Sequence, residues 1–370
     1  MKSPLPTWAE IILLPLINLL AAFFFCGVFV ALIGENPFAA LAIMVEGAFL
    51  YPGALGYTLY YTTNFIFAGL AVAVAFQAMM FNIGGEGQAA IGGLGAALVA
   101  LTLAPNFPGL IVIPLAILGA ALFGAFWGFI PGYLQAKRGS HVVITTIMFN
   151  FIAASLMVWL LAGPMIAPNQ MSPQTSTFEA SAQLAKMSTV LPFLGDLVSG
   201  SPLNISFFFA LLAAFFVWVL IWKTRLGYEI RTVGQNPDAA HYAGINVARV
   251  IIIAMSISGA LAGLMAINEV LGVQYRLVLN FTAGYGFTGI AVALMGRSHP
   301  VGIILASLLF GALYQGGAEL DFEFQTITRE MVVVIQGMII LFSGALAFMF
   351  APAVSRMLGF FGAKGARENG

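Results

Sequence analysis

The sequence has very little charge and almost no cysteine. Of its 370 residues only 8% are charged, and 14 basic residues balance 14 acidic ones to a formal net charge of +0. A chain without a basic excess offers no electrostatic face to nucleic acid, so we expect no nucleic-acid partner. The single cysteine, Cys26, excludes a disulfide framework and a thiolate metal cluster. It follows the bulky Phe25, which is not typical of a lipoprotein acylation site.

Motifs for nucleotide and metal chemistry are also missing. The sequence contains no G-x-x-x-x-G-K-[ST] phosphate loop and no H-E-x-x-H metal motif. Its three histidines are scattered, and no nucleophile lies near a candidate base. We therefore expect no catalytic residue, no metal ligand and no cofactor, and an enzyme ranks last among the functions considered.

Long apolar segments are what the sequence has instead, with 61% hydrophobic residues. Each of several uncharged runs can hold at least one membrane span of about 20 residues. These runs lie at 11–34, 47–85, 87–136, 142–163, 197–222, 250–268, 277–296, 298–318 and 331–355. We predict an all-α polytopic membrane protein of about ten transmembrane helices, forming a single domain over residues 1–370. The first run lacks a signal-peptide cleavage site and is read as a retained span.

The distribution of basic residues predicts the orientation of these spans. With ten spans and an inner N-terminus, most of the 14 basic residues fall on inner segments, and the acidic residues gather on outer ones, Glu269 among them. A Lys/Arg excess marks cytoplasmic segments, so both termini and the loop 223–249 are expected inside. The polar segment 164–204 is expected in the periplasm. It is too long for a simple connection and is either an ordered docking element or a lid.

Two glycine-rich stretches interrupt the apolar runs and predict broken helices. FNIGGEGQ at 81–88 carries Asn82, Glu86 and Gln88. A carboxylate inside a membrane is expensive, so Glu86 should face a polar cavity or a partner, unless the stretch is a solvated turn. GYGFTG at 284–289 fits a dinucleotide-binding pattern but lacks the preceding strand. It is interpreted as a discontinuous helix, with its aromatic residues near a pathway or simply packed.

The loop 223–249 contains a short helix with both ends marked. Asn236 can cap its first amides, Pro237 suits the first position, and Asp238 favours the positive end of the dipole. Gly244 can adopt the left-handed conformation that ends it. A helix of about two turns is marginal alone in water, so strong end signals suggest that a partner docks onto it.

Several motifs of the sequence resemble those of the permease subunits of bacterial ABC importers. They are FNIGGEGQAAIGG, RLGYEIRTVGQNPDAAHYAGINV, ISGALAGLMA, GYGFTGIAVALMGRSHPVG and IQGMIILF, spread in order from about Pro37 to Phe350. The similarity is greatest to the nucleoside or simple-sugar branch of the ribose and branched-chain amino acid group. Two departures are His141-Val142, where such permeases usually have Asn-Glu, and His241, where Arg is common.

The resemblance implies a coupling helix that contacts a cytoplasmic ATPase. The residues assigned to it are Asn236, Pro237, Asp238, Ala239, Ala240, Tyr242 and Gly244. It also implies a translocation path beside the FNIGGEGQ stretch. The candidate pathway residues are Asn82, Glu86, Gln88, Asn150, Tyr285 and Phe287. Ala239, Ala240 and Tyr242 are expected to project from the coupling helix towards the ATPase.

These observations together predict a multi-pass permease of the bacterial inner membrane that imports nucleosides. Its expected partners are a separate ATPase, an extracytoplasmic binding protein and a second permease. The chain length and the long first outer segment resemble the larger of two unlike permeases, which favours a heterodimer. Import of a sugar or a branched-chain amino acid is the alternative within this class. An ion-coupled secondary transporter is less favoured, because Glu86 is the only evident buried acid and no repeated half is evident.

Overall fold

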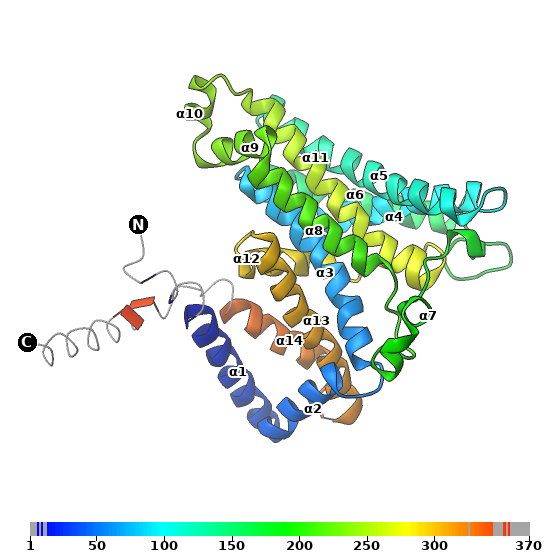
Figure 1. Ribbon diagram of the computed structural model, residues 1–370, viewed down its shortest axis with the longest axis vertical. Coiled ribbons are helices and arrows are strands. Elements are labelled where there is room, and N and C mark those ends of the chain that lie inside the picture. The colour runs from blue at the N-terminus through cyan, green and yellow to red at the C-terminus, as the bar shows by residue number, and fades with distance from the viewer. Residues whose placement is uncertain are drawn as a thin grey trace, which may run out of the picture. The chain divides into compact units, whose positions relative to one another are not determined.

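Figure 1 shows the computed structural model, which is built almost entirely of helices. The structure describes residues 13–324 and 326–342, and positions 6, 9, 351, 352, 354 and 355. Among these residues, strand-like pairing is limited to two isolated bridges, Gln174 with Val278 and Lys186 with Asn204. The elements are α1 (Leu14–Ile33), α2 (Pro37–Phe49), α3 (Ala54–Gln77), α4 (Gly85–Leu103), α5 (Gly109–Arg138), α6 (Val142–Ala162), η2 (Ala180–Ala182), α7 (Met187–Val190), η3 (Pro192–Leu197), α8 (Ser206–Lys223), α9 (Arg225–Gln235), α10 (Pro237–Tyr242), α11 (Val247–Ala266), η4 (Ile267–Gln274), α12 (Tyr285–Met295), α13 (Pro300–Glu323) and α14 (Arg329–Ile340).

The helix lengths confirm a polytopic all-α membrane protein. In the described part of the chain, 8 helices are long and apolar enough to cross a membrane. The sequence predicted about ten spans. The difference lies in α12 and α14, which have 11 and 12 residues where full spans were expected. Residues 343–350 of the last predicted span lie outside the described residues.

The irregular segments also differ in position from the prediction. α11 continues through the π-helical turn η4, so that one apolar element runs over Val247–Gln274. The backbone then turns irregularly until α12 begins at Tyr285, with positive φ at Tyr275, Asn280 and Ala283. Likewise α3 ends at Gln77 and α4 begins at Gly85. Both discontinuities exist; the first covers 78–84 and overlaps the first half of FNIGGEGQ, whereas the second lies almost entirely before GYGFTG.

The chain forms two compact units. One comprises Ala48–Gln315, and the other comprises the segments up to Gly47 and from Gly316. The prediction of a single domain stays a prediction. In the smaller unit α1 packs on α14, and the rings of Phe25 and Phe342 stack with centroids 4.7 Å apart. Cys26 is buried there, 6% exposed.

In the larger unit α5 and α11 meet backbone against backbone. A Cβ atom added to Gly124 would lie 2.3 Å from the Gly259 carbonyl oxygen, and one on Gly128 would lie 2.5 Å from the Met255 carbonyl oxygen. From the other side, a Cβ atom on Gly263 would lie 2.4 Å from the Ala120 carbonyl oxygen. Small residues one helical turn apart permit this close approach in lipid. The glycine spacing that the sequence shows in α5 is therefore a packing feature.

The two polar segments of the larger unit lie at opposite ends of its helices. Figure 1 shows α9 and α10 at one end and the segment that contains α7 at the other. This second segment is tied to the chain after α11. The amides of Thr175, Phe178 and Leu184 donate to the carbonyls of Leu277, Tyr275 and Leu271 at 3.0, 2.7 and 2.9 Å. These bonds show that the segment is ordered, and a docking role for it stays a prediction.

Candidate functional site

Asn82 is the centre of a buried amide network before α4. Its Oδ1 accepts from the Gly84 amide at 2.9 Å and from Gln88 Nε2 at 3.2 Å. Its Nδ2 donates to Gln88 Oε1 and to Ser258 Oγ, both at 2.8 Å. Asn82 and Gln88 are each 1% exposed. Their polar atoms are satisfied within the protein, so these two side chains hold the irregular backbone in place.

Asn150 on α6 closes the other side of the same turn. Its Oδ1 accepts from the Gly87 amide at 2.9 Å, and its Nδ2 donates to the Ile83 carbonyl at 3.0 Å. The Thr146 hydroxyl accepts from the Ile83 amide at 3.4 Å. The structure therefore brings three of the predicted pathway residues, Asn82, Gln88 and Asn150, around one non-helical stretch.

Glu86 joins this turn to the second glycine-rich stretch. One carboxylate oxygen accepts from the Gly284 amide at 2.8 Å and the other from the Gly286 amide at 2.9 Å. These are free amides at the beginning of α12, where a negative charge is favourable. Gly286 permits the approach, since a Cβ atom there would lie 2.4 Å from the Glu86 amide nitrogen. The carboxylate is thus neither in an empty cavity nor in a solvated turn.

The aromatic residues of the second stretch have different surroundings. Tyr285 is 6% exposed and meets the ring of Phe65 edge-on at 5.6 Å. Phe287 is 48% exposed. Phe287 is therefore the most exposed of the six predicted pathway residues, whereas Tyr285 belongs to a packed aromatic group.

A second buried acid was missed by the sequence analysis. Glu269 was placed among the outer acids, but it lies in η4 and is only 3% exposed. Its carboxylate accepts from the Tyr60 hydroxyl and, at 2.7 Å, from Asn64 Nδ2. Asn268 Nδ2 donates to Asn64 Oδ1 at 2.8 Å. We call Tyr60, Asn64, Asn268 and Glu269 the Glu269 cluster.

The prediction that Glu86 is the only buried acid is therefore wrong. The π-helical turn continues the helix past its expected end and brings Glu269 against α3. A partial signal existed, because Tyr60 and Asn64 are one helical turn apart and share a face of α3. Nothing local to Glu269 indicated that this face would meet it.

Tyrosine rings pack beside the Glu269 cluster. We call Tyr60, Tyr61, Tyr285 and Tyr314 the tyrosine wall. Ring centroids are 5.0 Å apart for Tyr60 and Tyr61, 5.6 Å for Tyr61 and Tyr314, and 6.1 Å for Tyr285 and Tyr314. Tyr60 and Tyr285 are buried, whereas Tyr61 and Tyr314 are half-buried. The wall therefore presents a partly open aromatic surface next to a buried carboxylate.

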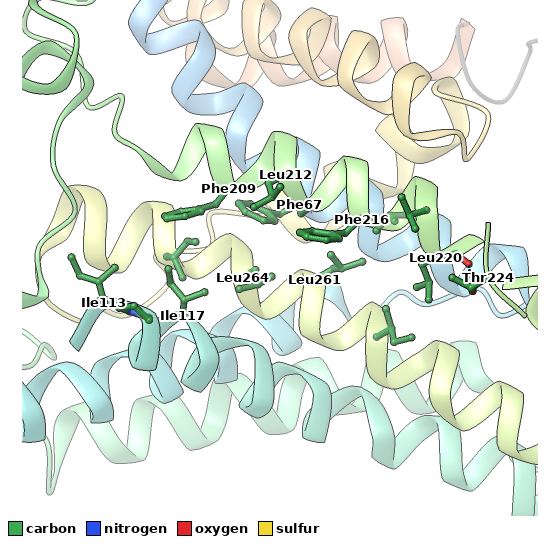
Figure 2. A pocket seen from close by; sticks show the side chains of 16 residues that line it. Phe67, Ile113, Ile117, Phe209, Leu212, Phe216, Leu220, Thr224, Leu261 and Leu264 are labelled. Carbon is green, nitrogen blue, oxygen red and sulfur yellow. Dashed lines mark hydrogen bonds between the residues drawn. The ribbon is translucent and has the colours of Figure 1, made fainter. Parts of the chain in front are cut away.

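An apolar groove of about 710 Å³ lies between α5, α8 and α11 of the larger unit. Figure 2 shows Phe209, Leu212 and Phe216 of α8 on one side and Leu261 and Leu264 of α11 on another. Thr224, which is labelled in Figure 2, is the polar side chain among the described residues that line the groove. Its hydroxyl donates to the Leu220 carbonyl at 2.6 Å and accepts from the Gly227 amide at 3.1 Å. The lining is almost entirely apolar, so the groove is poorly suited to recognising a hydrophilic molecule.

The short helix of the loop 223–249 is formed as predicted. In α10 the Asn236 side chain accepts from the Ala239 amide at 3.0 Å, and Pro237 occupies the first turn. Gly244 follows with φ +79°. The amphipathic helix α9, which the sequence analysis did not separate from the loop, precedes it and buries Ile230.

One expectation for this helix is wrong. Ala240 was expected to project from it, but its side chain is 0% exposed. The end signals define where the helix begins and stops, but not which face packs on the protein. Ala239 and Asp238 are exposed, and Tyr242 is 92% exposed. Tyr242 and Ala239 therefore form the outward face of α10.

Comparison with known proteins decides the family. The model of a family described as a branched-chain amino acid transport system permease component matches residues 54–344. This range includes both glycine-rich stretches, the Glu269 cluster and α10. The chain belongs to this permease family.

Relatives of the permease cover almost its whole length. It is 36% identical to the guanosine ABC transporter permease protein NupP of Bacillus subtilis, over 90% of this chain and 92% of the relative. It is 35% identical to the nucleoside ABC transporter permease protein NupB of Lactococcus lactis, over 90% of each chain. It is 34% identical to the glucose ABC transporter permease protein TsgB13 of Haloferax volcanii, over 89% of this chain and 86% of the relative.

Proposed function

We propose that this permease is the transmembrane subunit of an ATP-driven importer of nucleosides. The observation that carries the proposal is the similarity, over about nine-tenths of both chains, to permeases named for guanosine and for nucleosides. Sugar import is the second candidate, because the relative named for glucose is similarly close. A second buried acid such as Glu269 is a feature that would favour an ion-coupled transporter. Membership of the permease family is the stronger argument, and it favours an ABC importer.

The remaining parts of the proposal concern the partners. ATP hydrolysis takes place on a separate cytoplasmic ATPase, which contacts the outward face of α10. A binding protein delivers cargo to the ordered segment 164–204, and a second, unlike permease completes the pair. Along the path, Phe287 is the candidate that presents its side chain to the cargo. The other five candidates, Asn82, Glu86, Gln88, Asn150 and Tyr285, hold the surrounding backbone.

Reconstitution tests the cargo directly. We expect vesicles with both permeases, the ATPase and the binding protein to accumulate labelled guanosine only when ATP is hydrolysed. An excess of unlabelled adenosine or guanosine should reduce the signal, and the same excess of glucose should not. Glucose uptake with no nucleoside uptake would replace the proposal by the sugar alternative. Nucleoside uptake driven by a proton gradient without ATP would overturn it.

We further propose the bacterial inner membrane as the location, with both termini in the cytoplasm. Accessibility of single cysteines tests this orientation in a Cys26→Ala background, since the native thiol is buried. Cysteines at the exposed positions Ser172 and Ser199 should react with an impermeant reagent in intact cells, and one at the exposed Ala239 should react only after lysis. Ser201, although in the same segment, is 3% exposed and serves as a buried reference. Labelling of the Ala239 cysteine in intact cells would reverse the topology.

A further inference from the structure

The Glu269 cluster places a carboxylate inside an apolar helical element, where its hydrogen-bond donors are neutral side chains. Glu269 lies in the continuous element Val247–Gln274, which is apolar enough to span a membrane. Its hydrogen-bond donors, Tyr60 and Asn64, are neutral, and no basic side chain among the described residues pairs with it. Ionisable residues in such positions are expensive and usually mark a substrate or ion pathway. The π-helical turn points the same way, since such turns are frequent at functional sites.

Packing alone does not require this arrangement. Asn268 already fixes the turn on α3 through Asn64, at 2.8 Å, and through the Tyr60 carbonyl, at 3.2 Å. The Asn204 side chain adds a further bond to Asn268 Oδ1 at 2.8 Å. A neutral side chain at position 269 would leave these anchors in place. The carboxylate is therefore an additional acceptor beyond what holds the helices together.

The chemistry beside the carboxylate is aromatic. The Tyr60 hydroxyl bonds to Glu269, and the Tyr60 ring lies 5.0 Å from the ring of Tyr61. Tyr61 and Tyr314 are the half-buried members of the tyrosine wall. Stacking of a base on an aromatic ring contributes about 1–3 kcal/mol and tolerates any base. A carboxylate is an acceptor only, and it suits the paired hydroxyls of a ribose.

We infer that Glu269 and the tyrosine wall form the contact that distinguishes nucleosides from other cargo in the membrane. Glu269 accepts from the ribose hydroxyls, and the rings of Tyr61 and Tyr314 stack on the base. This inference rests on the proposed function and names the cargo class of the permease itself. A sugar offers the hydroxyls but no aromatic plane, so the two halves of the contact together select a nucleoside over glucose.

The hydrogen bonds seen in the structure fit a passing contact better than a tight site. The ribose would replace the Tyr60 hydroxyl on Glu269, which exchanges one neutral donor for another. This one-for-one exchange is nearly neutral in free energy, and the second ribose hydroxyl adds one hydrogen bond to the carboxylate, which a dideoxynucleoside cannot make. The carboxylate keeps a donor before, during and after passage, so cargo is recognised without being retained.

Uptake of matched cargo pairs by the complete complex tests the inference. The two cargoes are guanosine and 2′,3′-dideoxyguanosine, which lacks the ribose hydroxyls. We expect the parent to import guanosine about tenfold faster, as for a hydrogen bond to a charged group. Glu269→Gln should bring the ratio close to one. Because parent and variant share one binding protein, a change in the ratio reports on the permease. Glu46→Gln makes the same change at an exposed position and should keep the parental ratio.

The aromatic half is tested at Tyr314. Tyr314→Phe keeps the ring but loses the hydroxyl, which lies 3.0 Å from the Thr288 hydroxyl. Tyr314→Leu loses the ring as well. Guanosine uptake should be at least fivefold lower with Tyr314→Leu than with Tyr314→Phe, with ATPase association unchanged in both. An unchanged cargo ratio in Glu269→Gln, or equal uptake by the two Tyr314 variants, would overturn the inference. If the parental complex imports no nucleoside at all, it is the proposed function that fails.

Discussion

Ala239→Arg is expected to leave the permease inserted in the membrane and to abolish ATP-driven uptake. Ala239 lies on the outward face of α10 beside Tyr242, which is 92% exposed. Aromatic side chains of this kind are typical of the centres of protein interfaces. An arginine next to Tyr242 would lose its hydration when the ATPase binds, and this desolvation is unfavourable. Loss of such a contact costs about 2 kcal/mol or more, which corresponds to roughly 30-fold weaker binding of the ATPase.

The measurement is association with the ATPase in detergent, followed by uptake in vesicles. Asn106→Arg introduces the same side chain at an exposed position in the α4–α5 connection and should bind the ATPase as the parent does. Ala240→Arg is a different test, because its buried side chain should disturb α10 itself and reduce the yield of folded protein. Parental uptake by Ala239→Arg would show that α10 is a solvated loop and not the coupling element.

Glu86→Leu should have the other large effect, on stability and transport together. The substitution leaves the amides of Gly284 and Gly286 without their acceptors at 2.8 and 2.9 Å. Hydrogen bonds to charged groups contribute about 1.5–3 kcal/mol each, so α12 should separate from the turn before α4. We expect a lower melting temperature of the purified protein without cargo, and loss of uptake in the assembled complex.

A graded series separates this role from a direct cargo contact. Glu86→Gln keeps one acceptor oxygen but turns an amide donor towards the second backbone amide, so its melting temperature should lie between those of the parent and Glu86→Leu. Glu46→Leu removes an exposed carboxylate and should melt as the parent does. If Glu86→Leu lost uptake with an unchanged melting temperature, the carboxylate would contact cargo and would not support α12.

The features that depend on short-range order were predictable from the sequence. The helix of the loop 223–249 was found from Asn236, Pro237 and Gly244, because capping bonds involve neighbours in the chain. The pathway candidates also came together, since Asn82, Glu86 and Gln88 lie in one turn and their glycines allow close backbone contacts.

The features that depend on distant partners were not predictable. The exposure of Ala240 depends on which face of α10 packs against the protein, and helix-end signals carry no such information. Glu269 is buried because η4 extends α11 beyond its expected end and meets Tyr60 and Asn64, which are far away in the chain. A charged residue at the end of an apolar run is normally a sign that the span has ended. Here the helix continues through Glu269 as the π-helical turn η4.

The glycine contact between α5 and α11 has a mechanical meaning. Where backbones touch directly, no side chains lie between them that could change rotamer and let one helix slide along the other. We therefore expect the two helices to move as one unit. α11 begins a few residues after α10, and its continuous element of 28 residues, about 40 Å long at 1.5 Å per residue, ends at the Glu269 cluster. If the ATPase displaces α10, as proposed, we expect α11 and α5 to move together and to carry the displacement to the Glu269 cluster and the tyrosine wall.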